Sequence, residues 1–490
     1  MTDTLRDQAS KEIQDVQRWL GQLQEQIATQ TPQAIAKLAR ADDIVQGRLP
    51  APPEPPDPPS PPDVDPPAPP DPQPDPPTDE WSFPSPVVNR PENLDFIVAG
   101  SELRSSADQT LGTHQNPIKA AIHSSPPGAT IRIGIKGETR GLIYGTGSKH
   151  GPDTSFQTHP NGEYATPTVH MVGLTGDAKV HGVSLGSQYG RLNALRLFDM
   201  TLGDESEEAA MCLGTKAGAW LSELVIDNVM FAPSGTGYGG HGAKWGMHPD
   251  DEVGLFIWRN CRRAQRAGVP VTFQEHVGYN KNMGAVWIEN NDLSGGNRTG
   301  FQYRSDETES QGKRPWGPVV VRDNYADGYG MEHNVHSGGS CITLWCNPDY
   351  PTLIEGNRIT NARYGCLAVT DYNSSYHDAE GYAHQHVMIR DNVFTQHPGR
   401  GNANGGGDTR SPAKAGSAHS LEFERNQLVA TNKAYSELTI DGSWLWDHGA
   451  PKTKSVRFST LPKYRVATYD EKANKVRLFT EDELTSMVGA

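Results

Sequence analysis

The chain has 490 residues, enough for two or three domains and a substantial hydrophobic core. A formal net charge of −15 argues against nucleic acid as a partner of the whole molecule, and no stretch approaches the ~20 apolar residues of a membrane span. The first residues carry acids and amides where a signal peptide has a basic patch and an apolar run, so we expect synthesis in a reducing cytosol. The five cysteines lack paired, metal-type spacing, and buried free thiols are favoured over a bridge between Cys341 and Cys346.

Residues 1–47 are predicted to be helical. Five apolar residues recur at alternating steps of three and four, the pattern of a coiled-coil seam: Ile13, Val16, Leu20, Leu23 and Ile27. Thr31 and Pro32 then have the character of the N-cap and first position of a second helix. We interpret this part as an oligomerisation or docking segment; the alternative is an amphipathic helical hairpin that packs on nothing in particular.

Residues 48–80 are dominated by proline. Residues 50–77 hold 17 prolines, with interspersed acids and no basic residue. Such a segment forms neither helix nor sheet, and we expect a semi-rigid polyproline spacer with a rise of about 3.1 Å per residue. The alternative is a ligand for a proline-binding domain, which the lack of Arg or Lys anchors disfavours.

Residues 81–434 contain a repeat in which a short β-branched or aromatic run is followed by Asn. The spacings between the last Asn of successive copies are 32, 31, 33, 33, 35 and 34 residues. These residues are Asn228, Asn260, Asn291, Asn324, Asn357, Asn392 and Asn426. A fixed period predicts stacked units, and the apolar runs predict that each unit begins with a strand. Asn tolerates a left-handed turn, and its amide can bond the Asn of the neighbouring unit. The sequence therefore predicts a parallel β-helix.

The segment before the repeats, residues 116–133, combines a short amphipathic helix, a Pro-Gly turn and a strand. Together with the Asn-ended units, it resembles the entry of the right-handed, pectin-lyase-like parallel β-helix superfamily over roughly residues 95–430. The resemblance implies an all-β solenoid whose N-terminal end is capped by the helix, because an uncovered end exposes an unpaired strand edge. From residue 435 to 490 the period is lost, and alternation in residues 463–467 and 475–479 predicts a cap region with a hairpin.

A second strand follows each Asn turn, and this second column mixes aromatic with charged residues. Neighbouring units lie about 4.8 Å apart, so residues at one level form a continuous row. Such a row suits an extended saccharide, because sugar rings stack on aromatic side chains and sugar hydroxyl groups need polar partners. The candidate substrate-binding residues are Trp245, Tyr303, Trp345 and Tyr372. The alternative is that half of these aromatic side chains point inward and fill the core.

Glycan chemistry needs either two carboxylates or a base next to a uronate. The candidate catalytic residues are Glu275, His276, Arg304, Asp306 and Asp371. Glu275 with Asp306, or Asp306 with Asp371, would supply the pair for hydrolysis, whereas Arg304 or His276 would supply the base of a lyase. The simpler interpretation of any one of these charges is a solvated outer face, so the sequence leaves open whether the protein is an enzyme.

Other motifs in the sequence give weaker evidence of function. Residues 240–242 match a Gly-His-Gly element of polygalacturonases without the acidic motifs that should precede it, and residues 286–290 match a pectate-lyase element with its His replaced by Asn. In the insertion after Asp371, His377-Asp378-x-Glu380 and His384-x-His386 are interpreted as solvated residues and not as a metal site. Without a phosphate loop, a dinucleotide fingerprint or a nucleophile elbow, no cofactor is expected.

The succession of a docking piece, a stiff spacer and a β-helical body resembles bacteriophage tailspikes and related virion appendages. The resemblance implies a virion protein, made in the host cytoplasm and attached through residues 1–47, that binds host surface polysaccharide as a homo-oligomer. A trimer fits the helix seam and the resemblance, but two heptads leave the number of subunits open. Three functions stay open: a polysaccharide-binding spike, with or without depolymerase activity; a non-catalytic structural or receptor-binding fibre; and a bacterial polysaccharide lyase or glycoside hydrolase, which the missing export signal disfavours.

Overall fold

The computed structural model describes most of the second part of the chain. The described residues are 81–144, 167–185, 192–203, 209–213, 220–232, 240–244, 252–263, 274–281, 283–294, 299–304, 317–328, 340–344, 347, 349–362, 365–370, 378, 380–396, 411–430, 436–442 and 451–489. The predicted docking segment, residues 1–47, and the predicted spacer, residues 48–80, lie outside them. Among the described residues, no helix is long and apolar enough to cross a membrane.

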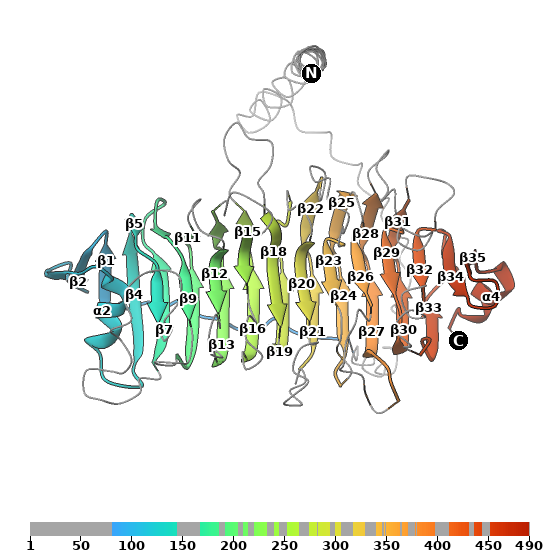
Figure 1. Ribbon diagram of the computed structural model, residues 1–490, viewed down its shortest axis with the longest axis horizontal. Coiled ribbons are helices and arrows are strands. Elements are labelled where there is room, and N and C mark those ends of the chain that lie inside the picture. Colours follow the sequence, from blue (N-terminus) through green and yellow to red (C-terminus); the bar gives the residue numbers. More distant parts are fainter. Residues whose placement is uncertain are drawn as a thin grey trace, which may run out of the picture. The chain divides into compact units, whose positions relative to one another are not determined.

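These residues form long sheets of mostly parallel strands (Figure 1). Sheet A has the strand order β3 (Thr110–Thr113), β2 (Glu102–Ser105), β1 (Phe96–Ala99), β4 (Thr130–Lys136), β7 (Thr168–Gly173), β10 (Ala194–Phe198), β13 (Trp220–Asp227), β16 (Glu252–Arg259), β19 (Met283–Glu289), β21 (Val319–Arg322), β24 (Thr352–Glu355), β27 (His384–Arg390), β30 (Ala418–Glu424) and β33 (Ser455–Phe458). Sheet B has two pieces, β17 (Arg262–Arg263), β14 (Met230–Phe231), β11 (Thr201–Leu202), β8 (Lys179–Val180) and β5 (Glu138–Thr139), and then β22 (Tyr325–Asp327), β25 (Arg358–Ala362), β28 (Val393–Gln396) and β31 (Gln427–Val429). Sheet C has the order β35 (Lys475–Leu478), β34 (Val466–Asp470), β32 (Leu438–Ile440), β29 (Ala413–Ala415), β26 (Leu367–Val369), β23 (Ile342–Leu344), β20 (Thr299–Arg304), β18 (Gln274–Lys281), β15 (Gly240–Lys244), β12 (Ala209–Leu213), β9 (Val183–Leu185) and β6 (Leu142–Tyr144).

The chain visits the three sheets in turn, so that neighbouring strands of one sheet are one repeat apart in the sequence. After β13 in sheet A the chain enters β14 in sheet B and β15 in sheet C, and it then returns to sheet A as β16. Strands of successive repeats pair in parallel in all three sheets. This topology is compatible with the expected β-helix solenoid.

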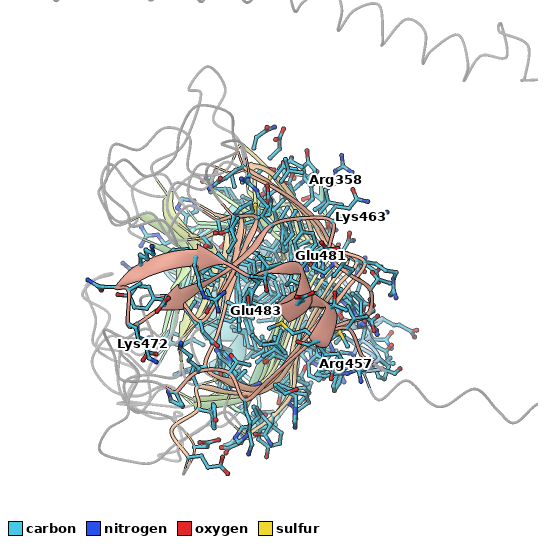
Figure 2. The ribbon with its side chains drawn as sticks, turned by 90° about the vertical axis from the view of Figure 1, so that its right-hand side faces the viewer. Arg358, Arg457, Lys463, Lys472, Glu481 and Glu483 are labelled. Atoms are coloured by element: carbon cyan, nitrogen blue, oxygen red, sulfur yellow. The ribbon has the colours of Figure 1, made fainter. Side chains whose placement is uncertain are left out.

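Both ends of the stack carry antiparallel elements. At the N-terminal end, β1 pairs with β2 and β2 with β3, and the predicted helix is present as α2 (Pro117–His123), whose N-cap Asn116 accepts a 3.1 Å hydrogen bond from the Lys119 amide. At the C-terminal end, β34 and β35 form the predicted hairpin, and α4 (Glu481–Ser486) follows it (Figure 2). Parallel strands β32 and β33 come after residue 434, so the repeats continue past the predicted end of the body.

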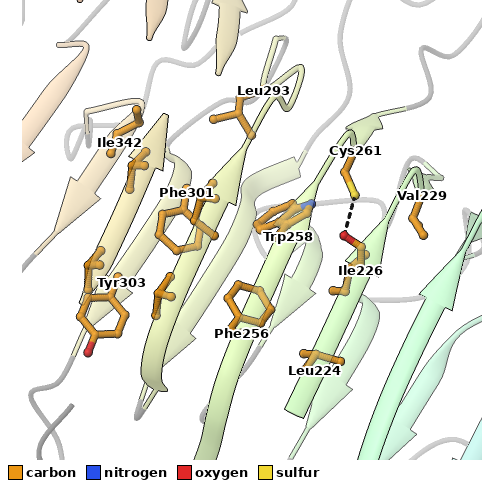
Figure 3. Close-up of a cluster of buried hydrophobic side chains, with 14 of the residues drawn as sticks. Leu224, Ile226, Val229, Phe256, Trp258, Cys261, Leu293, Phe301, Tyr303 and Ile342 are labelled. Carbon is orange, nitrogen blue, oxygen red and sulfur yellow. Dashed lines mark hydrogen bonds between the residues drawn. The ribbon is translucent and has the colours of Figure 1, made fainter. Parts of the chain in front are cut away.

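The interior of the stack is a continuous apolar core made by the inward side chains of the sheets. Trp258 is fully buried there, with Phe231 and Phe301 packed edge-on against it at centroid distances of 5.5 and 5.8 Å (Figure 3). The thiols of Cys261, Cys341 and Cys366 are free and buried, as predicted, and burial raises their pKa values. Such thiols act as small hydrophobic groups.

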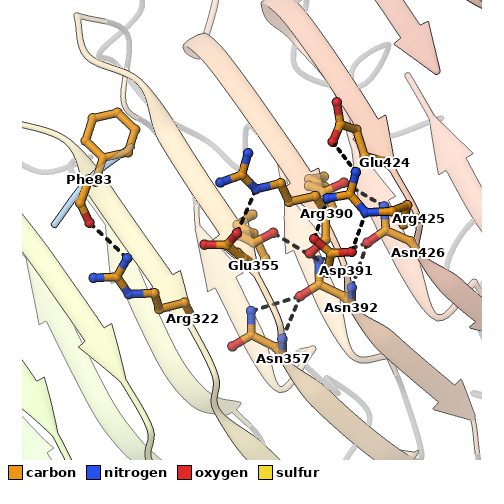
Figure 4. Close-up of polar contacts among 12 residues, drawn as sticks. Phe83, Arg322, Glu355, Asn357, Arg390, Asp391, Asn392, Glu424, Arg425 and Asn426 are labelled. Atoms are coloured by element: carbon orange, nitrogen blue, oxygen red, sulfur yellow. Dashed lines mark hydrogen bonds and ion pairs between the residues drawn. The ribbon is translucent and has the colours of Figure 1, made fainter. Parts of the chain in front are cut away.

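The predicted Asn turns are present, in two adjacent columns and not in one. The residue after each sheet A strand has a left-handed backbone in seven successive repeats: Asn228 (φ 55°), Asn260 (φ 55°), Asn290 (φ 52°), Asp323 (φ 55°), Gly356 (φ 65°), Asp391 (φ 57°) and Arg425 (φ 47°). The next residue forms an amide ladder through Asn291, Asn324, Asn357, Asn392 and Asn426 (Figure 4), in which each Nδ2 donates to the Oδ1 of the next at 2.9, 2.9, 3.0 and 3.0 Å. Bonding between Asn side chains of neighbouring repeats is therefore confirmed, but Asn228 and Asn260 belong to the turn column and not to the ladder.

The outer face of sheet A carries an apolar stripe with one side chain per repeat. The stripe consists of Val225, Ile257, Trp287, Val320, Leu353 and Met388, which are in register and buried. Residues 81–90, which we call the strap, lie against this stripe, with Trp81 in the same cluster and Phe83 packed on it. Because the strap covers the stripe, the stripe side chains are shielded from water although they lie on the outer face of sheet A.

A column of alternating charge lies two residues beyond the apolar stripe on each strand of sheet A. It consists of Asp227, Arg259, Glu289, Arg322, Glu355, Arg390 and Glu424. Arg259 pairs with Asp227 at 2.9 Å, Arg322 with Glu289 at 2.5 Å and Arg390 with Glu355 at 2.7 Å. Arg322 also donates to the Phe83 carbonyl at 2.9 Å (Figure 4), and Arg259 donates to the Pro86 carbonyl at 3.3 Å. The charge column thus fixes the strap through its main chain.

Candidate functional site

The strands predicted to hold the glycan-binding row are neighbours in sheet C, namely β15, β18, β20, β23 and β26. Most of the predicted side chains cannot be placed on them. Trp245, Asp306, Trp345, Asp371 and Tyr372 lie outside the described residues. Glu275 and His276 in β18 and Arg304 in β20 have a described backbone, and their side chains lie outside the description.

Tyr303 is the one predicted site residue whose side chain is described, and it is buried. It is 1% exposed and belongs to the apolar core (Figure 3). Phe301 and Tyr303 pair with Ile342 and Leu344 of β23, and all four point inward because side chains of one parity share a face of the sheet. Its assignment to the substrate-binding row is therefore wrong.

The register of sheet C separates two predicted catalytic residues that we expected at one level. His276 pairs with Thr299, whereas Arg304 pairs with Lys281, five residues further along the strands. At about 3.3 Å per residue, their backbones are offset by about 16 Å along the strand direction. His276 and Arg304 therefore cannot act on one bond from adjacent positions of a row.

Along the outer face of sheet A, the apolar character ends at β27. Met388 pairs in register with Glu422 of β30, which pairs with Arg457 of β33, and the two charges form an ion pair at 3.1 Å. At the start of the same strands, exposed His386 pairs with Ser420, and Nδ1 lies 2.7 Å from Oγ. This end of sheet A presents polar side chains to solvent.

Two groups of contacting residues make up the candidate site, which we call the polar corner. Asp378, Tyr382 and His419 contact one another, and His386 contacts Ser420, the residue that follows His419 in β30. The carboxylate of Asp378 accepts hydrogen bonds from the backbone amides of Glu380 and Tyr382, at 2.8 and 3.0 Å, and from Nε2 of His419. The ring of Tyr382 lies over that of His419, with a centroid distance of 4.4 Å. The sequence forms this turn because an Asp side chain can bond amides two and four residues on.

The electrostatics of the polar corner follow from these contacts. Burial opposes ionisation of Asp378, but the hydrogen bonds from His419 and from the two amides outweigh it, so the pKa of Asp378 is lowered. Asp378 is therefore ionised at neutral pH, and it holds His419 with the proton on Nε2. Nδ1 is then the ring nitrogen of His419 that can take a proton or a hydrogen bond from a ligand.

The polar corner offers an aromatic face, an imidazole and a hydroxyl group within a few residues of one another. Hydroxyl-rich ligands need this combination of an apolar surface and polar partners. Both oxygens of Asp378 are already engaged, and Glu380 pairs with Lys454 at 3.4 Å. The described residues of the corner thus supply binding groups and one candidate base, and not the pair of free carboxylates that hydrolysis needs.

Among the described residues, no group of three or more His, Cys, Asp or Glu side chains could hold a metal ion. His386 is exposed, as a solvated histidine should be. His384, two residues earlier, is 1% exposed, so the interpretation of that residue as solvated is wrong. His377 lies outside the described residues.

Sequence reasoning missed two features that shape the site. The alternating charge column is visible in the sequence, because one residue per repeat, directly before the turn, changes sign from Asp227 to Glu424. The Asp378–His419 pair has no comparable signal, since its partners are separated by 41 residues and belong to no repeating position.

Comparisons with known proteins give no match. No protein-family model, no curated protein and no solved structure resembles the chain closely enough to be counted as related.

Proposed function

We propose that the protein is a spike or fibre of a virion that binds a polysaccharide on the host surface, with a right-handed parallel β-helix of the pectin-lyase-like kind as its body. The β-helix is supported by the passage of the chain through three parallel sheets, repeat after repeat. Attachment through residues 1–47, assembly as a homo-oligomer and the trimeric state are parts of this proposal that rest on the sequence.

The observation that carries the proposal is the polar corner at the end of an otherwise covered face. The strap seals the apolar stripe of sheet A as far as Met388, whereas His386 and Ser420 present polar groups at the end of this face. The ring of Tyr382 lies against His419, the residue before Ser420. A long, stiff body with a hydroxyl-binding patch on one end fits an adhesin for surface glycans.

The experiment is a binding and cleavage assay with capsular polysaccharide and lipopolysaccharide extracts from candidate hosts. Binding to immobilised glycan is measured for the full chain, for Tyr382→Ala and for the control Tyr325→Ala, whose ring is 42% exposed on sheet B. We expect Tyr382→Ala to weaken binding about tenfold and Tyr325→Ala to leave it within about twofold, since an aromatic contact contributes about 0.5–1.5 kcal/mol beyond the area that it buries. Equal losses in both variants, or no binding to any extract, would contradict the proposal.

Two alternatives are separated in the same assay by following unsaturated products in the ultraviolet together with new reducing ends. New ends that disappear in His419→Ala identify a depolymerase that uses the polar corner, whereas binding without new ends identifies a non-catalytic fibre. Deletion of residues 1–47 separates a virion protein, which would lose particle association, from a free polysaccharide lyase or glycoside hydrolase, which would lose nothing.

A further inference from the structure

One buried turn brings together the two segments of chain that form the polar corner, residues 378–386 and residues 419–420. The turn contains Ser417, which lies between β29 and β30 and is fully buried. The Ser417 carbonyl accepts hydrogen bonds from the backbone amides of Ala383 and His384, both at 2.9 Å, and its hydroxyl group accepts another from the Ala383 amide at 3.1 Å. Ser417 therefore fixes the first segment next to the second, which begins two residues later.

The backbone of Ser417 has an unfavourable conformation. Its φ is 55°, in the left-handed region that residues with a Cβ rarely adopt, and such a conformation persists where neighbouring groups hold it. Asp441, which follows β32, is the neighbour that does so: its Oδ1 accepts a hydrogen bond from the Ser417 amide at 3.3 Å. Gly416 lets the carboxylate come this close, because a Cβ built on Gly416 would lie only 2.8 Å from that Oδ1.

The same carboxylate also holds the chain that leads into β33. Oδ1 of Asp441 accepts a hydrogen bond from the Thr453 hydroxyl at 2.7 Å, and Oδ2 accepts one from the Thr453 amide at 3.0 Å. Two residues earlier, Pro451 packs against the turn of the polar corner, since a Cβ built on Gly381 would lie 3.5 Å from it. Asp441 thus joins the Ser417 turn to a second piece of chain that borders the corner.

Burial of this carboxylate is costly. Asp441 is 6% exposed, and burial raises the pKa of its side chain although the hydrogen bonds from Thr453 and Ser417 act in the opposite direction. The ionised group therefore loses more in hydration than it gains from its partners, so the charge itself does not stabilise the folded state. A buried acid of this kind is better explained by the geometry that it maintains.

We infer that Asp441 is a positioning residue of the polar corner, which it shapes by holding Ser417 in the left-handed turn. Through this turn it sets how the ring of Tyr382 lies relative to the side chains of His419 and Ser420. A carboxylate suits the position because all three of its partners donate, and an ionised acid offers acceptors alone. This inference rests on the proposed function and adds to it a residue that acts on the ligand through others.

The test compares two variants of the full chain in which a buried acid is replaced by its amide. Asp441→Asn keeps the shape of the side chain and tolerates the φ of 49°. Its NH2 group replaces one acceptor, however, and leaves the amide of either Ser417 or Thr453 without a partner. The control is Asp227→Asn in sheet A, at a residue that is 4% exposed and pairs with Arg259 at 2.9 Å. Urea denaturation measures the stability of both variants.

Two further measurements separate positioning from stability. Binding to an immobilised capsular polysaccharide or lipopolysaccharide extract should weaken about tenfold in Asp441→Asn and stay within about twofold in Asp227→Asn. Without glycan, the amides of Ala383 and His384 should exchange hydrogen at least about tenfold faster in Asp441→Asn and within about threefold of the original rate in Asp227→Asn. The urea midpoint should fall at least as far in Asp227→Asn, because that variant leaves Arg259 without its buried partner.

Equal losses of binding in the two variants, or unchanged exchange of the two amides in Asp441→Asn, would overturn the inference. If binding depends on Tyr382 and not on Asp441, the inference is wrong and the proposed function stands. If the unmodified protein binds no extract, the proposed function fails, and the exchange rates alone decide whether Asp441 holds the turn.

Discussion

Asn357 is the ladder residue whose replacement tests the fold most directly. It is fully buried, and its Oδ1 accepts from the backbone amide and the Nδ2 of Asn324, at 3.1 and 2.9 Å. Its Nδ2 donates to the Val321 carbonyl at 2.8 Å and to Oδ1 of Asn392 at 3.0 Å. Asn357→Ala leaves all four groups without this partner in the interior, and each buried, unsatisfied group costs about 1–3 kcal/mol. Allowing for relaxation, we expect a loss of about 4 kcal/mol in the free energy of unfolding, a large share of the ~5–15 kcal/mol of a typical domain.

The assay is denaturation by urea, followed by tryptophan fluorescence, with the midpoint and the slope analysed together so that a change in stability is separated from a change in the unfolded state. The controls replace Asn by Asp at two positions. Asn357→Asp places a carboxylate against two acceptors in the core and should be at least as harmful as Ala at neutral pH. Asn290→Asp changes an exposed turn residue that keeps its left-handed backbone and should cost less than about 1 kcal/mol. A cost below about 1 kcal/mol for Asn357→Ala would refute the view that the ladder holds neighbouring repeats together.

Three further outcomes are expected. Trp81→Ala removes the ring that anchors the strap, which is 7% exposed. Loss of such a buried ring costs about 3 kcal/mol, so hydrogen exchange in residues 83–90 should become about 100-fold faster. An unchanged exchange rate would show that the strap is held by its main chain alone. Because the pKa of Asp378 is lowered on folding, its ionisation stabilises the native state above pH ~4, and this stabilisation is lost as the pH falls further. In acid titrations, the stability difference between the unmodified protein and Asp378→Asn should therefore shrink below pH ~4. A difference that grows there would contradict the lowered pKa. In a variant with Cys212→Ser and Cys346→Ser, the remaining thiols are those of Cys261, Cys341 and Cys366. They should resist a thiol reagent at pH ~8 until denaturant is added, since burial raises their pKa values. Rapid labelling of the native protein would show instead that these thiols are accessible.

Sheet A was predictable from the sequence and sheet C was not, for a geometric reason. In sheet A, each strand from β10 to β30 is followed by a residue with a left-handed backbone, such as Asn260 or Asn290, so the turn fixes which residue of one repeat lies beside which residue of the next. The strands of sheet C follow connections whose lengths differ from repeat to repeat, so the repeat pattern does not fix their register. The sequence pattern therefore showed that β18 and β20 are neighbours but could not show that Arg304 lies beside Lys281, or that Tyr303 points inward.

The strap illustrates a second limit. Residues 81–90 have no period and little apolar pattern, and their partners lie far away in the sequence: Pro86 and Arg259 are 173 residues apart, and Phe83 and Arg322 are 239 residues apart. What the sequence does contain is the other half of the interaction, a second run of apolar side chains on the strands of sheet A. Val225, Ile257 and Val320 are out of phase with the inward residues, and a contiguous apolar row of this kind is normally covered by another segment or by a partner. A row of that kind predicts a covering segment even when the segment itself cannot be recognised.

The position of the candidate site follows from which part of the outer face of sheet A is apolar and therefore covered by the strap. From β13 to β27, the outward residue at the stripe position is apolar in every repeat, and this flank is closed to a hydrophilic ligand because the strap and the stripe form one dry cluster. At β30 and β33 the same position holds Glu422 and Arg457, which require water or polar partners and not a covering segment. The change of side chain at one position of the repeat thus marks the boundary between the part of the face used for internal packing and the part open to a partner. The polar corner lies at that boundary, where His386 of β27 pairs with Ser420 of β30, and we therefore assign the proposed glycan binding to it and not to the strap-covered flank.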